Sequence, residues 1–228
     1  MRKNLIILFV LLPVFFSCDR KRNSSSEKSN TSKVELKVSE NTNNQDSLTI
    51  SLDKFIDTKY EFVDNTGKSL IIENSLPKGG QKYTDINGKE YVYAIFWTQI
   101  TNKMDCPFEV NLTFSADSFE LPSSPGNYFK LFLPSEKMTP TRAPLYNFGL
   151  EDLNTVLNGK LQNPSTLVRT VNTNETSQFY VVSLFKEGVN GVVRAGMSLK
   201  NEKIYYRVND REIQSGRVNI KLRTQEIK

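Results

Sequence analysis

Apolar and polar residues alternate along most of the chain. The alternation is clearest in 108–114, 193–200 and 218–223, where every second residue is apolar. Because successive side chains of a strand point to opposite faces of a sheet, this period predicts strands with one buried face. The segments 91–98 and 179–185 are largely apolar at both parities and predict interior strands.

Turn sequences separate these predicted strands at short intervals. Asn87-Gly88 is a strong hairpin signal, because a type I′ turn needs positive φ at both central positions. The stretch 64–67 (Asp-Asn-Thr-Gly) predicts a second hairpin, and Asn201-Glu202 predicts a third. About eight to ten short strands spaced in this way are typical of a β-sandwich. We therefore expect an all-β fold, an immunoglobulin-like antiparallel β-sandwich that forms a single domain over residues 48–228.

One short helix is predicted near 149–158. Leu150, Leu153 and Leu157 have the i, i+3, i+7 spacing of one helix face, and a glycine directly after the segment suits its end. The acidic pair at 151–152 favours the positive end of a helix dipole. We expect this helix to cover one end of the sandwich.

The N-terminal sequence, MRKNLIILFVLLPVFFSC, combines two positive charges with an apolar run. The run is shorter than the roughly 20 apolar residues of a spanning helix, so it predicts the core of an export signal. Phe15 stands where ordinary signal cleavage requires a small residue, whereas Ser17, directly before Cys18, is small. The segment resembles the signal of bacterial lipoproteins. That resemblance implies that residues 1–17 are removed and that Cys18 is acylated and becomes the mature N-terminus.

The resemblance also implies attachment to a membrane of the bacterial cell envelope. Each buried methylene of an acyl chain contributes about 0.8 kcal/mol, so more than one chain gives a durable anchor. The alternative is an uncleaved apolar anchor, which would export the rest of the chain equally well. Asp19 resembles the inner-membrane retention signal of enteric lipoproteins, but that rule does not extend to all bacteria. The choice between inner and outer membrane therefore stays open.

Residues 18–47 predict a flexible tether. Beyond Asp19 this stretch is rich in Ser, Asn and charged residues, and its apolar residues are Val34, Leu36 and Val38. So few apolar side chains cannot offset the entropy of ordering the segment. A coil of about 30 residues spans roughly 30 Å, enough to lift a domain off a bilayer. These three apolar residues occupy every second position, so a short accessory strand within the tether is the alternative to a fully flexible segment.

Composition excludes several classes of site. The 228 residues include no histidine and two cysteines, which excludes Ser-His-Asp catalysis, His-ligated metals and four-cysteine metal centres. The formal net charge of +5 is spread along the chain, whereas nucleic-acid binding needs clustered basic residues. Only Lys103 lies near Cys106 to activate it, and Asp105 opposes thiolate formation. We expect no catalytic residue, no cofactor, no metal and no nucleic-acid partner.

Glycoside hydrolysis uses two carboxylates that come together in the folded protein, and no fixed spacing in the sequence marks them. The sequence therefore does not exclude such a pair. The alternative for each carboxylate is a solvated surface charge. The candidates are Glu109, Asp117, Glu120, Glu151 and Asp152.

The stretch 119–148 contains five of the nine prolines. Proline restricts the unfolded alternatives of a loop, and ordered loops with aromatic residues often form partner or sugar sites. The candidate residues in these loops are Met138, Leu145, Tyr146 and Phe148. The alternative is that these loops fold back over the edge of the core.

Together these features predict a lipid-anchored envelope protein whose exported sandwich is a non-catalytic binding or assembly module. Its partners would be the membrane, through the anchor, and an envelope protein or glycan. One alternative is a glycan-binding accessory or glycan-acting enzyme that uses paired carboxylates. Another is a chaperone that binds by strand addition at an exposed sheet edge. The sequence does not indicate the oligomeric state.

Overall fold

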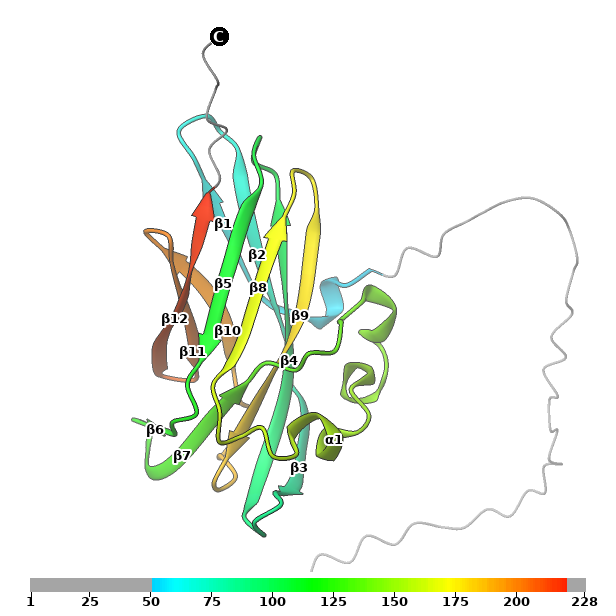
Figure 1. Cartoon of the computed structure of the whole chain (residues 1–228), viewed down its shortest axis with the longest axis vertical. Helices are drawn as coiled ribbons and strands as arrows, with labels where there is room; N and C mark the ends of the chain where they lie inside the picture. The colour runs from blue at the N-terminus through cyan, green and yellow to red at the C-terminus, as the bar shows by residue number, and fades with distance from the viewer. Residues whose placement is uncertain (1–50, 221–228) are drawn as a thin grey trace, which may run out of the picture. The chain divides into compact units, whose positions relative to one another are not determined.

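Two antiparallel β-sheets face each other in the computed structural model, which describes residues 51–220 (Figure 1). In the first sheet the strands lie in the order β1 (Ile56–Val63), β2 (Ser69–Ser75), β4 (Glu90–Asn102), β9 (Thr176–Phe185), β7 (Ser124–Phe132) and β6 (Phe119–Leu121), and β3 (Lys78–Thr84) also pairs with β4. In the second sheet the order is β10 (Ala195–Lys200), β11 (Lys203–Val208), β12 (Arg211–Ile220), β5 (Phe108–Phe114) and β8 (Ser165–Val171). The helical elements are α1 (Leu153–Leu157) and the 3₁₀ turns η1 (Asp53–Phe55), η2 (Pro140–Arg142) and η3 (Tyr146–Gly149).

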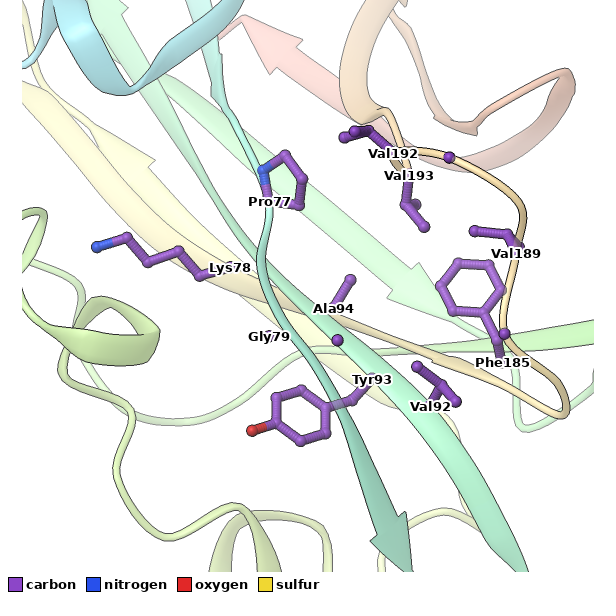
Figure 2. A pocket seen from close by; sticks show the side chains of 13 residues that line it. Pro77, Lys78, Gly79, Val92, Tyr93, Ala94, Phe185, Val189, Val192 and Val193 are labelled. Carbon is purple, nitrogen blue, oxygen red and sulfur yellow. The ribbon is translucent and has the colours of Figure 1, made fainter. Parts of the chain in front are cut away.

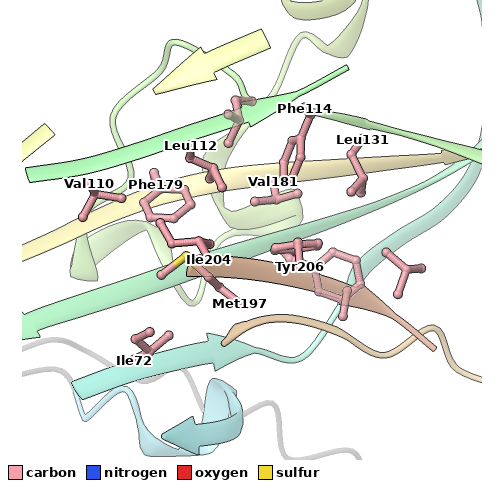
Figure 3. Close-up of a cluster of buried hydrophobic side chains, with 14 of the residues drawn as sticks. Ile72, Val110, Leu112, Phe114, Leu131, Phe179, Val181, Met197, Ile204 and Tyr206 are labelled. Carbon is pink, nitrogen blue, oxygen red and sulfur yellow. The ribbon is translucent and has the colours of Figure 1, made fainter. Parts of the chain in front are cut away.

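The main core lies between the two sheets. Figure 3 shows Val110, Leu112 and Phe114 of β5 facing Phe179 and Val181 of β9. The alternate residues of β5 are less buried, as the period of two in 108–114 predicts. The strand alternation in the sequence is thus explained by one face on the core and one face outside it.

A second apolar cluster covers the outer face of the first sheet. The segment from Met138 to Leu161, which includes α1, packs its apolar side chains against the outward-facing residues of β4 and β9. Trp97 of β4 is fully buried there and meets Phe148 edge-on, with ring centroids 6.4 Å apart. The two strands that are apolar at both parities therefore lie between two cores.

The structure confirms the all-β sandwich and the three predicted hairpin turns. These turns join β1 to β2, β3 to β4 and β10 to β11. The described residues form twelve strands, more than the expected eight to ten, because the Lys- and Gly-rich β3 and the three-residue β6 lack clear alternation. The immunoglobulin-like strand order stays a prediction.

The predicted helix is shorter than expected. It spans only Leu153–Leu157, because Asp152 accepts a hydrogen bond from the Thr155 amide at 3.1 Å and so marks the helix start. Leu150 precedes the helix but is still buried in the second cluster. The apolar spacing thus identified the buried face correctly and overestimated the helix length.

The proposed signal 1–17, the acylated Cys18 and the tether 18–47 lie outside the described residues. Within residues 51–220, the longest helices fall short of the length and apolar content needed to cross a membrane.

Tyr206 is fully buried between the sheets, and its hydroxyl has no hydrogen-bond partner among the described residues. Removing an unpaired buried hydroxyl relieves a desolvation cost. We expect Tyr206→Phe to raise the free energy of unfolding by about 1 kcal/mol at neutral pH. Urea unfolding measures this change, and an unchanged or lower stability would contradict it. Tyr205→Phe, at a half-buried neighbour, is the control.

Tyr206 also predicts a pH dependence. Burial raises the pKa of Tyr206 in the folded protein above its value in the unfolded chain. A group whose folded pKa is raised contributes stability below its unfolded pKa, about 10 for tyrosine, and loses that contribution as the pH rises further. The stability advantage of Tyr206→Phe should therefore widen by about 1 kcal/mol between pH 9 and pH 11. A constant difference over this range would contradict the assignment.

Candidate functional site

An open cleft of about 500 Å³ lies between the start of β3 and the loop from β9 to β10. Val92 and Ala94 of β4 and Phe185 of β9 form its apolar floor (Figure 2). The loop side carries three valines, and the β3 side is mostly backbone. The loop valines are Val189, Val192 and Val193. Ligand pockets of this size are typically lined by apolar groups, so we take this cleft as the candidate site.

The backbone of β3 forms one wall because Gly79 allows it to lie close to β4. Gly79 and Gly80 have φ of +118° and +88°, which residues other than glycine rarely adopt. A Cβ at Gly79 would lie 2.8 Å from the Tyr93 carbonyl oxygen and 2.9 Å from the Tyr93 ring. The register between β3 and β4 shifts between Gly79 and Lys82, which is a β-bulge. The Lys-Gly-Gly sequence therefore shapes the cleft wall.

The ionisable groups beside the cleft point away from it. Figure 2 shows the side chains of Lys78 and Tyr93 on the side of β3 opposite the loop valines. Lys78 Nζ donates hydrogen bonds to the carbonyl oxygens of Ala143 at 2.8 Å and Leu145 at 2.6 Å. It also lies 4.3 Å from the centroid of the Phe148 ring. Burial lowers the pKa of Lys78 from its ordinary value.

A polar cluster ties β3 to the loop at 145–149. The Gln81 amide oxygen accepts hydrogen bonds from the hydroxyls of Tyr93 and, at 2.6 Å, Tyr146. Asn147 Nδ2 donates to the Tyr93 hydroxyl at 3.1 Å. Burial is the main cause that raises the pKa of Tyr93. Lys78 and this cluster together hold the edge strand β3 against the second core.

The structure divides the four predicted loop residues into two pairs. Met138 and Phe148 are buried in the second core, so for them the loop does fold back over the core. Leu145 and Tyr146 are 49% and 65% exposed. These four residues do not form one surface, and neither exposed residue lines the cleft.

The backbone at Asn147 and Phe148 is strained. Their φ values are +48° and +56°, and Gly149 follows at +72°. Such values are outliers for a residue as large as phenylalanine. This conformation places the Phe148 ring under Trp97, and the Phe148 carbonyl accepts a hydrogen bond from the Tyr180 hydroxyl at 2.7 Å.

Three of the five candidate carboxylates have local structural roles. Asp152 caps α1, and Glu120 accepts a hydrogen bond from the Gly126 amide at 2.8 Å. Glu109 accepts one from Asn111 at 2.9 Å. Cys106 is a half-buried free thiol. Across residues 51–220, His, Cys, Asp and Glu side chains form no group of three that could hold a metal ion.

Comparison with protein-family models, curated proteins and solved structures found no match to this chain.

Sequence reasoning missed the cleft. Its loop reads Gly188-Val-Asn-Gly-Val-Val193, and three valines among glycines in a loop are the signal that could have indicated it. Their meeting with Ala94 and Phe185 depends on strand pairing between distant segments, which spacing along the chain does not show.

Proposed function

We propose that this protein is a lipid-anchored component of the bacterial cell envelope whose β-sandwich is a non-catalytic binding module. The cleft beside β3 receives an apolar group of an envelope partner protein. The supporting observation is the composition of the cleft: its side chains are apolar, and Lys78 and Tyr93 point to its other side. An apolar floor favours a ligand through burial of surface, about 25 cal/mol per Å², and offers no group for acid–base chemistry.

Val192 reports on the rim of the cleft because it is 61% exposed. A photo-cross-linking amino acid at position 192 of the full chain should give a discrete adduct in intact cells. The matched control is position 63, where a valine of β1 is 63% exposed. Adduct formation at 192 and not at 63 is the expected result, and equal or absent adducts at both positions would overturn the proposal.

Gly188 allows the cleft to be blocked without disturbing the fold. A Cβ at Gly188 would meet no atom within 4 Å, and its φ lies outside the left-handed region. We expect Gly188→Phe to reduce the position-192 adduct at least about tenfold, and Gly188→Ala to leave it nearly unchanged. Both variants should unfold at the denaturant concentration of the parent. An adduct that survives Gly188→Phe would show that the partner does not enter the cleft.

The glycan-binding alternative is supported by one observation, the exposed ring of Tyr146. Its hydroxyl is held by Gln81, so the ring is oriented as a sugar-stacking surface would be. If this surface is the binding site, Tyr146→Ala removes binding in a glycan screen and Val192→Asp does not. If instead Val192→Asp removes binding and Tyr146→Ala does not, and protease digests the partner cross-linked at position 192, the result supports the cleft as a protein-binding site.

A further inference from the structure

The sheet edges of the described residues differ in how they are protected from pairing with another chain. Free edges carry unpaired N–H and C=O groups, which proteins usually block with charges, bulges or short strands. β1 has a bulge between Ile56 and Thr58 and carries Asp57, Lys59 and Glu61. β3 has its glycine bulge and two lysines, and β6 has three residues.

The edge of β10 is also blocked. Met197 directs its backbone amide and carbonyl to the Asn74 side chain, with hydrogen bonds of 2.8 and 3.0 Å. Asn74 belongs to β2 of the first sheet, so its amide group occupies the place where a neighbouring strand would pair.

β8 ends the second sheet with a single charged residue, Arg169, and without a bulge. Its sequence, Ser-Thr-Leu-Val-Arg-Thr-Val, contains no proline, glycine or lysine, and it pairs with β5 without a register shift. Hydrogen bonds from neighbouring segments reach β8 at its two ends: Ser165 Oγ accepts from the Leu133 amide, and the Val171 carbonyl accepts from Asn102 Nδ2, both at 3.0 Å. Between these ends, Leu167 packs against the main core. Val168 at the centre is 66% exposed.

We propose that β8 pairs antiparallel with β8 of a second copy of this chain, so that the two five-stranded sheets become continuous. A two-fold axis at Val168 places Val168 opposite Val168 of the second copy and Thr166 opposite its Thr170. All seven residues of β8 overlap in this register. Cross-strand pairs of β-branched residues and threonines are favourable.

The charges near β8 fit a second copy. Arg169 is the only charged residue of β8, and the two-fold register places it opposite an uncharged leucine, Leu167 of the second copy. Lys160 lines a hollow at the Ser165 end of β8, and Glu175 lies in the turn after its Val171 end. Antiparallel pairing brings the Lys160 end of each copy towards the Glu175 end of the other. The two ends of this edge thus carry opposite charges, which antiparallel pairing brings together.

The register can be tested by cysteine cross-linking of the purified full-length chain. Directly opposite residues of an antiparallel pair have Cα atoms about 4.5–5.5 Å apart, within the range of a disulfide. In a Cys106→Ser background, Val168→Cys should form a reducible dimer on oxidation at least about tenfold faster than Val63→Cys. The background chain, which retains Cys18, should give no dimer.

Two further variants make the test specific to the register. Thr166→Cys alone should not cross-link, because the two copies of residue 166 would lie about 14 Å apart. Thr166→Cys combined with Thr170→Cys should cross-link as Val168→Cys does. Val168→Lys should abolish dimers of the otherwise unchanged chain in sedimentation analysis, whereas Val63→Lys should leave them.

Equal cross-linking at positions 166, 168 and 63 would overturn the proposal. A cross-link from position 168 to a different protein would also overturn it, because β8 would then pair with another partner. The result is independent of the cleft, since blocking the cleft with Gly188→Phe should leave the position-168 dimer unchanged.

Discussion

Asn74→Ala is expected to lower the free energy of unfolding by about 4 kcal/mol, because one buried amide holds four hydrogen bonds. Its Nδ2 donates to Thr58 Oγ1 at 3.1 Å and to the Met197 carbonyl at 3.0 Å. Its Oδ1 accepts from Thr98 Oγ1 at 3.0 Å and from the Met197 amide at 2.8 Å. The side chain thus joins β1, β2 and β4 of one sheet to β10 of the other.

The truncation would leave the amide and carbonyl of Met197 buried without partners, and each such group costs about 1–3 kcal/mol. Urea unfolding followed by circular dichroism measures the loss. Asn219→Ala, on an exposed position of β12, should change the stability by less than about 0.5 kcal/mol. Equal midpoints for the two variants would show that Asn74 does not join the sheets.

Gly216→Ala is expected to destabilise the fold by about 3 kcal/mol or more, although it adds a single methyl group. A Cβ at Gly216 would lie 1.9 Å from the carbonyl oxygen of Asn111 and 3.1 Å from the Cα of Leu112. Both atoms belong to the backbone of β5, so relief requires β12 and β5 to separate. This pairing joins β8 and β5 to the rest of the second sheet.

Gly188→Ala provides the control for Gly216→Ala, because a Cβ there meets open space. The two variants have the same change in composition and a similar effect on the unfolded chain. A midpoint shift confined to Gly216→Ala is the expected outcome of thermal and urea unfolding. Similar shifts in both would mean that the loss comes from the unfolded state.

The sheets could be predicted because their signals are local. The alternation in 108–114 and the turn at Asn87-Gly88 each specify an element from a few neighbouring residues. Residues 91–98 are apolar on both faces of the strand, which indicated that a second layer must cover the outer face of the sheet. That layer proved to be α1, which the sequence suggested as a cover at one end of the sandwich, and the proline-rich loop segment, for which folding back over the core edge was the alternative.

The sites could not be predicted in the same way because they depend on contacts between distant segments. Asn74 is polar in a strand and would be assigned to a solvent-facing position, yet it meets Met197, 123 residues away. Phe148 suggested a ligand loop, but a left-handed backbone turns its ring into the core. The free edge of β8 follows from its position at the end of a sheet, which only the strand order reveals.

The account rests on attachment of the sandwich to a membrane by acylated Cys18. Mass spectrometry of the N-terminal peptide of the protein purified from its native membrane tests this most directly. The expected result is a peptide that begins at Cys18 and carries the mass of two or three acyl chains. A peptide that contains Ser17 joined to an unmodified Cys18 would contradict acylation at Cys18, and with it the lipid anchor of the proposed function.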